Sequence, residues 1–151
     1  MKIKSMFRQL VTLSLSLVMC VLMIPGASAA SYQIGDVTIE TGMSDPHQIQ
    51  PRMVIYSQNV SDATIYNADF SCNENNGTTM KFTIKNTGNA SIYVDVYMNG
   101  ELIPGSYVVP AGESRFTRVN DKNGGLDDDF RFHLYTLNDE PMSCTMYAEQ
   151  Y

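Results

Sequence analysis

The chain has 151 residues, of which 44% are hydrophobic, and its 16 acidic and 10 basic side chains give a formal net charge of −6. An excess of negative charge repels phosphate backbones and anionic lipid surfaces, so the composition argues against nucleic-acid and membrane-surface binding. A chain of this length corresponds to one domain with a single core.

The segment 1–30 has the pattern of a secretory signal peptide. Three basic side chains lie within its first eight residues, and an uncharged apolar run follows over residues 10–24. Small residues at Ala27–Ala29 suit a signal peptidase, so cleavage is expected after Ala29 or Ala30. The apolar run is shorter than the roughly 20 residues of a membrane-spanning helix. We therefore predict a secreted, extracellular protein without stable membrane insertion, whose mature chain has 7 basic and 16 acidic residues.

Residues 31–52 are expected to form a flexible leader. Two glycines and two prolines interrupt this segment, and its sequence has no sustained alternation. The alternative for Val37–Glu40 is a short edge strand. Ordered structure is expected to begin after Pro51-Arg52.

The segment 53–151 reads as a series of short strands separated by turns. Alternation of apolar and polar side chains is clearest between residues 80 and 98, where β-branched and aromatic residues dominate. Asn99-Gly100 is typical of a two-residue hairpin turn. The predicted strands are Met53–Gln58, Ala63–Cys72, Thr79–Lys85, Ser91–Met98, Ser106–Val109, Ser114–Asn120, Asp129–Leu137 and Met142–Glu149. No amphipathic helix separates them, which predicts an all-β antiparallel sandwich of seven or eight strands, immunoglobulin-like or jelly-roll.

The core and a disulfide follow from the same alternation. Once Cys20 leaves with the signal peptide, Cys72 and Cys144 remain as a pair in an oxidising compartment, and both are in phase with buried neighbours. We therefore expect a Cys72–Cys144 disulfide; the alternative is two reduced, buried thiols. The expected inward-facing residues are Phe70, Phe82, Ile84, Ile92, Val94, Val96, Phe116, Phe130, Phe132, Leu134 and Met146.

The segment from Phe82 to Ser114 resembles the middle strands of bacterial immunoglobulin-like domains of the CARDB kind. The matching positions are Asn86 and Gly88, Val94 and Val96, Gly100, and Ala111 to Ser114. The whole chain also resembles small secreted proteins of Gram-positive bacteria, which have a signal peptide, an "I-x-P-R" segment as at Ile49–Arg52, and a β-rich body. The chain has no tryptophan, so it departs from antibody-type domains, in which a tryptophan packs on the disulfide.

Two groups of polar residues are candidate binding sites. The first is predicted on the solvent face of two strands, where tyrosines can stack on sugar rings or anchor a protein partner. It contains Tyr93, Asp95, Tyr97, Arg131, His133 and Tyr135, and it forms one platform only if the two strands are neighbours. The alternative is that tyrosine simply favours exposed strand positions.

The second group lies on the acidic, glycine-rich stretch Asp121–Asp129. Its oxygen ligands, Asp121, Asn123, Asp127 and Asp129, could bind a structural calcium ion, although the EF-hand spacing is not met. The alternative is a solvated acidic hairpin tip that discourages edge-to-edge aggregation. No other cofactor is predicted.

No catalytic residue is predicted. The sequence has no "G-x-S-x-G", P-loop, "H-E-x-x-H" or dinucleotide motif, and neither His47 nor His133 has diagnostic neighbours. We expect an exported, non-catalytic binding or adhesion-type module that recognises a glycan or a protein at the cell surface. The alternative is a secreted effector, such as a bacteriocin-like protein or a hydrolase inhibitor.

Overall fold

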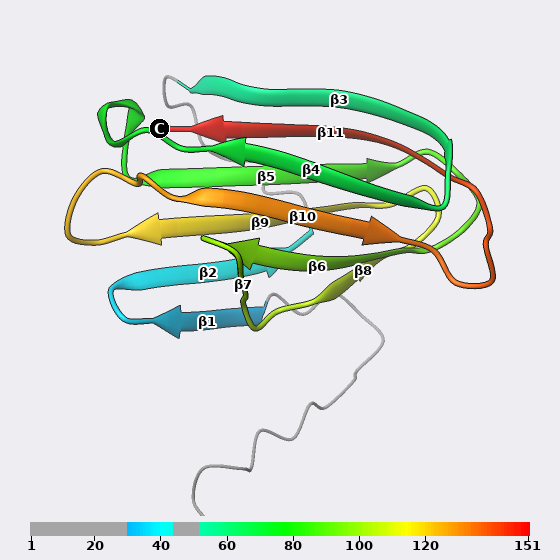
Figure 1. Ribbon diagram of the computed structural model, residues 1–151, viewed down its shortest axis with the longest axis horizontal. Coiled ribbons are helices and arrows are strands. Elements are labelled where there is room, and N and C mark those ends of the chain that lie inside the picture. The colour runs from blue at the N-terminus through cyan, green and yellow to red at the C-terminus, as the bar shows by residue number, and fades with distance from the viewer. Residues whose placement is uncertain (1–29, 44–51) are drawn as a thin grey trace, which may run out of the picture.

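Two antiparallel β-sheets packed against each other make up the fold (Figure 1). The computed structural model describes residues 30–43 and 52–151, and these form eleven strands and one short 3-10 helix, η1. No helix among these residues is long and apolar enough to cross a membrane. The elements are β1 (Ala30–Ile34), β2 (Val37–Gly42), β3 (Met53–Ala63), β4 (Ile65–Ser71), η1 (Glu74–Asn76), β5 (Thr79–Asn86), β6 (Ile92–Met98), β7 (Glu101–Leu102), β8 (Tyr107–Val109), β9 (Ser114–Asp121), β10 (Asp129–Tyr135) and β11 (Met142–Gln150).

The order of the strands identifies the sandwich as a jelly roll. Sheet A has the order β1-β2-β9-β5-β11-β3, and sheet B has the order β4-β10-β6-β7, with β8 also paired to β6. From β3 onwards the pairs are nested: β3 with β11, β4 with β10, β5 with β9, and β6 with β7 and β8. Successive pairs alternate between the sheets, as in a jelly roll. The predicted all-β antiparallel sandwich is confirmed, and the structure has three strands, β1, β2 and β7, beyond the predicted eight.

Within the predicted flexible leader, residues 31–52, the structure has two strands: β1, which begins at Ala30, and β2, which contains the alternative strand Val37–Glu40. These strands pair with each other and extend sheet A, because β2 pairs with β9 from Val37–Asp121 to Gly42–Phe116. Ile39 contributes to the core and is only 1% exposed. The glycines and prolines in this segment indicate where strands can end. They do not indicate that β9, distant in the sequence, pairs with β2. Residues 44–51 of the leader, and the predicted signal segment up to residue 29, lie outside the described residues.

Stacked aromatic rings fill the space between the sheets. Phe82 of sheet A lies against Phe132 of sheet B with ring centroids 3.9 Å apart, and Phe70 stacks on both. The predicted inward-facing residues lie in the core, with one exception. Phe116 pairs with Thr83, whose neighbours Phe82 and Ile84 point inward, so Phe116 faces away from the core. The cationic groups of Lys81 and Arg118 lie over its ring in cation–π contacts.

The predicted disulfide is not formed, because the two cysteines lie at opposite ends of the sandwich. Cys144 is near the start of β11, whereas Cys72 precedes Asn73, whose N–H donates to the Gln150 side chain near the end of β11. Six residues of strand separate Cys144 from Gln150, or roughly 20 Å at about 3.3 Å per residue. A disulfide requires Cα atoms within about 7 Å. Both cysteines are buried free thiols, which was the alternative interpretation.

Candidate functional site

All six residues of the predicted platform lie on the outer face of sheet B. The strands β6 and β10 are direct neighbours, with Tyr93 opposite Tyr135, Asp95 opposite His133, and Tyr97 opposite Arg131. The residues between them on each strand, including Val96 and Phe132, are buried in the core. The condition on which the sequence prediction depended is therefore met. Together with outward residues of β4 and β8, these side chains form three rows that cross the strands.

The first row is apolar. It consists of Ile65, Tyr135, Tyr93 and Val108, one from each of β4, β10, β6 and β8. The Tyr93 and Tyr135 rings stack with centroids 5.5 Å apart and an interplanar angle of 21°. Partial burial, followed by the charge of Asp95, raises the pKa of Tyr135. Ile65 remains 61% exposed beside them.

The second row is polar and follows directly. His133 lies between Asn67 and Asp95, and its Nδ1 is 2.7 Å from the Asn67 Oδ1. An amide oxygen only accepts, so Nδ1 carries the proton, and in the neutral ring Nε2 can accept. Asp95 accepts a hydrogen bond of 2.6 Å from the Ser106 hydroxyl through Oδ1. The row thus offers the Asn67 amide nitrogen as a donor, and the His133 Nε2 and the second Asp95 carboxylate oxygen as acceptors.

The third row combines an ion pair with an aromatic ring. Asp69, Arg131 and Tyr97 are aligned across β4, β10 and β6. Arg131 donates from Nε and Nη2 to the two Asp69 oxygens, at 2.6 and 3.4 Å. This contact raises the pKa of Arg131. Both side chains are more than half exposed, so the pair orients the guanidinium more than it stabilises the fold.

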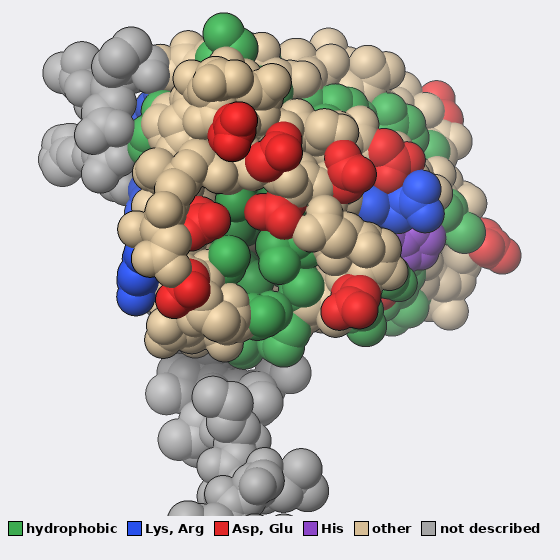
Figure 2. Space-filling view, turned by 60° about the vertical axis from the view of Figure 1, so that its left-hand side comes forward, with side chains coloured by type: hydrophobic (Ala, Val, Ile, Leu, Met, Phe, Trp, Pro, Cys, Tyr) green, Lys and Arg blue, Asp and Glu red, His purple; other side chains and the backbone are tan. Residues whose placement is uncertain are grey.

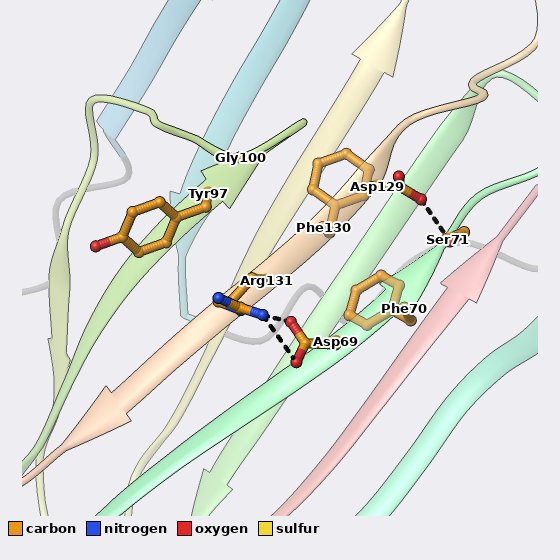
Figure 3. Close-up of a pocket in the computed structure, with 8 residues that line it drawn as sticks. All are labelled: Asp69, Phe70, Ser71, Tyr97, Gly100, Asp129, Phe130 and Arg131. Carbon is orange, nitrogen blue, oxygen red and sulfur yellow. Dashed lines mark hydrogen bonds and ion pairs between the residues drawn. The ribbon is translucent and has the colours of Figure 1, made fainter.

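A hollow of about 580 Å³ lies at the third row (Figure 3). Its polar lining comes from Asp69 and Ser71 of β4 and from Asp129 and Arg131 of β10, with Tyr97 of β6 on the opposite side. The Ser71 hydroxyl donates to Asp129 at 2.5 Å. The structure therefore places hydrogen-bonding groups from adjacent strands around one concavity. Such a mixture of an aromatic ring and fixed polar groups is typical of small polar ligand sites.

The acidic stretch Asp121–Asp129 joins β9 to β10, and acidic side chains gather at this end of the sandwich (Figure 2). Two of the predicted calcium ligands, Asp121 and Asp129, form hydrogen bonds with different protein groups. Asp121 accepts a hydrogen bond from the N–H of Asn123, whereas Asp129 accepts from Ser71. Across residues 30–43 and 52–151, no group of three or more His, Cys, Asp and Glu side chains is placed to hold a metal ion. Calcium binding stays a prediction.

Strand β4 also contributes to the platform, which the alternation of β6 and β10 alone does not predict. Ile65, Asn67, Asp69 and Ser71 alternate with the inward Tyr66, Ala68 and Phe70, so their shared face is readable from the sequence. Their position next to His133 and Arg131 cannot be read from the sequence. It depends on the pairing of β4 with β10, whose contacting residues are more than sixty positions apart in the chain.

Comparisons of the chain with known proteins give no match to a family model, a curated protein or a solved structure. The resemblance to CARDB domains stays a prediction.

Proposed function

We propose that this protein is an exported, non-catalytic module that binds a glycan through the outer face of sheet B. One observation carries the proposal: the stacked pair Tyr93–Tyr135 lies directly beside the polar row of Asn67, His133 and Asp95. A sugar ring has an apolar C–H face and a rim of hydroxyls. An aromatic surface flanked by oriented donors and acceptors complements both.

The charge of this face favours a glycan over a protein partner. The central part of a protein–protein interface is depleted of charged residues. Here Asp95 lies between Tyr93 and Tyr97 on β6, and the ion pair of Asp69 and Arg131 shares a row with Tyr97. Sugar hydroxyls form hydrogen bonds with such groups while much of the surrounding water remains. The exported location rests on the signal-peptide pattern.

A glycan-array screen of the mature chain, beginning at Ala30, tests this proposal. Tyr93→Ala combined with Tyr135→Ala is expected to remove binding that the wild type shows. Tyr147→Ala is the matched control, because Tyr147 is an exposed tyrosine on the outward side of β11 in sheet A. Equal circular dichroism spectra and melting temperatures of the variants would establish that the fold is intact.

Two outcomes would contradict the proposal. One is glycan binding that survives in the double variant, which would move the site elsewhere. The other is the absence of any glycan ligand together with a surface protein that the wild type binds and the double variant does not. That second result would identify the face as a protein interface.

A further inference from the structure

We infer that the ligand is a neutral oligosaccharide that lies along β6 and β10, with one end in the hollow beside Tyr97. This inference rests on the proposed function and adds the length, direction and charge of the ligand. It depends on three features of the outer face of sheet B: two separate aromatic positions, a polar row between them, and the charge balance of the hollow.

The two aromatic positions set the length and direction. Tyr93 and Tyr97 are four residues apart on β6, which corresponds to about 13 Å at a rise of about 3.3 Å per residue. The neighbouring strand repeats this spacing, because Tyr135 is opposite Tyr93 and Arg131 is opposite Tyr97. One sugar ring cannot contact both positions, whereas a short chain of sugars running parallel to the strands can.

The polar row lies where the middle of such a chain would pass. Asp95 and His133 occupy the position halfway between the two aromatic positions on their strands. The Asn67 contact holds the His133 ring, and the Ser106 contact holds the Asp95 carboxylate. Groups that are held in advance lose little conformational entropy when they bind hydroxyls. The face therefore presents stacking, hydrogen-bonding and stacking positions in succession.

The two ends of this path differ. At the Tyr93–Tyr135 end the surface is an apolar row, flanked across the strands by the exposed side chains of Ile65 and Val108. At the Tyr97 end the hollow brings the ion pair of Arg131 and Asp69 together with Asp129. The hollow has room for a terminal sugar, whereas the exposed apolar row offers a surface along which the chain can continue. We therefore place one end of the oligosaccharide in the hollow.

The charges around the path select a neutral ligand. Asp69, Asp95 and Asp129 carry negative charge there, and the Arg131 guanidinium is already bound by both Asp69 oxygens. The carboxylate of a uronic acid would lie near these carboxylates while Arg131 is already paired with Asp69. Like charges brought together cost free energy. Neutral sugars avoid this cost and still bind carboxylates and the guanidinium through their hydroxyls.

The test uses isothermal titration calorimetry on the mature chain with neutral gluco-, manno-, xylo- and N-acetylglucosamine oligomers, from monosaccharide upward. Affinity is expected to rise at least about tenfold from disaccharide to the longest oligomer. Tyr93→Ala and Tyr97→Ala should each weaken the longest oligomer by about tenfold, the loss of one stacking position, and should flatten the dependence on length. Tyr147→Ala should change nothing.

Charge selection is tested with uronic-acid oligomers of matched length. The wild type is expected to bind them at least about tenfold more weakly than neutral oligomers, and Asp69→Asn should reduce this difference because it frees Arg131. Monosaccharide binding as tight as that of the longest oligomer, or uronic-acid binding equal to neutral binding, would overturn this inference. If Tyr93→Ala still weakened such binding, the proposed glycan function would stand. Binding to no glycan at all would refute the proposed function itself.

Discussion

Gln150 and Asn73 form a reciprocal pair of hydrogen bonds that joins the last strand to the segment before η1. The Asn73 N–H donates to the Gln150 Oε1 at 3.0 Å, and the Gln150 Nε2 donates to the Asn73 carbonyl oxygen at 2.8 Å. Gln150 is fully buried, and its Nε2 also contacts the carbonyl oxygens of Gly77 and Leu126. The Gln150 side chain thus joins two connections at the acidic end of the sandwich. Asn73 and Gly77 belong to the connection between β4 and β5, and Leu126 belongs to the connection between β9 and β10.

Gln150→Leu is expected to lower the free energy of unfolding by about 3 kcal/mol. Leucine preserves the apolar stem but leaves the Asn73 N–H and the Leu126 carbonyl oxygen without the partner that Gln150 supplies. The Asn73 and Gly77 carbonyl oxygens keep their bonds from the Asn76 and Leu126 N–H groups. Each unsatisfied buried group costs about 1–3 kcal/mol. Urea unfolding followed by circular dichroism measures the change. Gln58→Leu, at an exposed position of β3, is the control and should stay within about 0.5 kcal/mol. Equal losses in both variants would contradict the role assigned to Gln150.

Asn86 has the corresponding role at the opposite end of the sandwich. Its Nδ2 donates to the carbonyl oxygens of Ala90 and Val109 at 2.7 and 3.0 Å, and its Oδ1 accepts from the Gly88 N–H. Asn86→Asp replaces both donors with oxygen and should lower the free energy of unfolding by about 2–4 kcal/mol. The matched control is Asn59→Asp at an exposed position of β3. Unfolding midpoints in urea that shift alike would show that Asn86 is dispensable.

Reductant is expected to leave the melting temperature unchanged. Cys72 and Cys144 are buried free thiols at opposite ends of the sandwich, so there is no bond for a reductant to break. Differential scanning fluorimetry of the mature chain with and without reductant measures this. A thiol assay of the same chain, which lacks Cys20, should find two reactive groups in denaturant and almost none in the native protein. A drop in melting temperature with reductant would mean that the cysteines are joined.

Alkaline pH is expected to destabilise the protein through the same thiols. Burial raises the pKa of Cys72 to about 12 and that of Cys144 to about 11, from about 9 in an exposed thiol. The unfolded chain therefore loses these protons first, so the thiols' contribution is intact below about pH 9 and declines as the pH rises toward 12. Urea midpoints measured from pH 7 to 11 should fall less in Cys72→Ala with Cys144→Ala, relative to its own value at pH 7. An identical decline in both proteins would assign the effect to other groups, such as Tyr56 and Tyr107, whose pKa burial also raises.

The positions of the strands follow largely from the sequence, because side chains that alternate with period two reveal which residues face a core. This local rule predicts β3 to β6, β8 to β11, and the shared faces of Tyr93 with Tyr97 and of Arg131 with Tyr135. It fails for Phe116, which was predicted to face the core. Its ring lies on the outer side of sheet A and forms cation–π contacts with Lys81 and Arg118. The rule does not predict β1, and it gives β2 only as the alternative at Val37–Glu40; in the structure β2 pairs with β9, and β1 pairs with β2.

The sequence by itself determined that this chain is an all-β domain whose outward tyrosines, histidine and arginine lie on particular strand faces. The tertiary structure alone decided that β10 lies between β4 and β6, which makes one platform from residues more than sixty positions apart. It also decided that Cys72 and Cys144 lie at opposite ends. The physical reason is that alternation is a property of each strand, whereas strand order arises from the nested closure of the whole chain into two sheets.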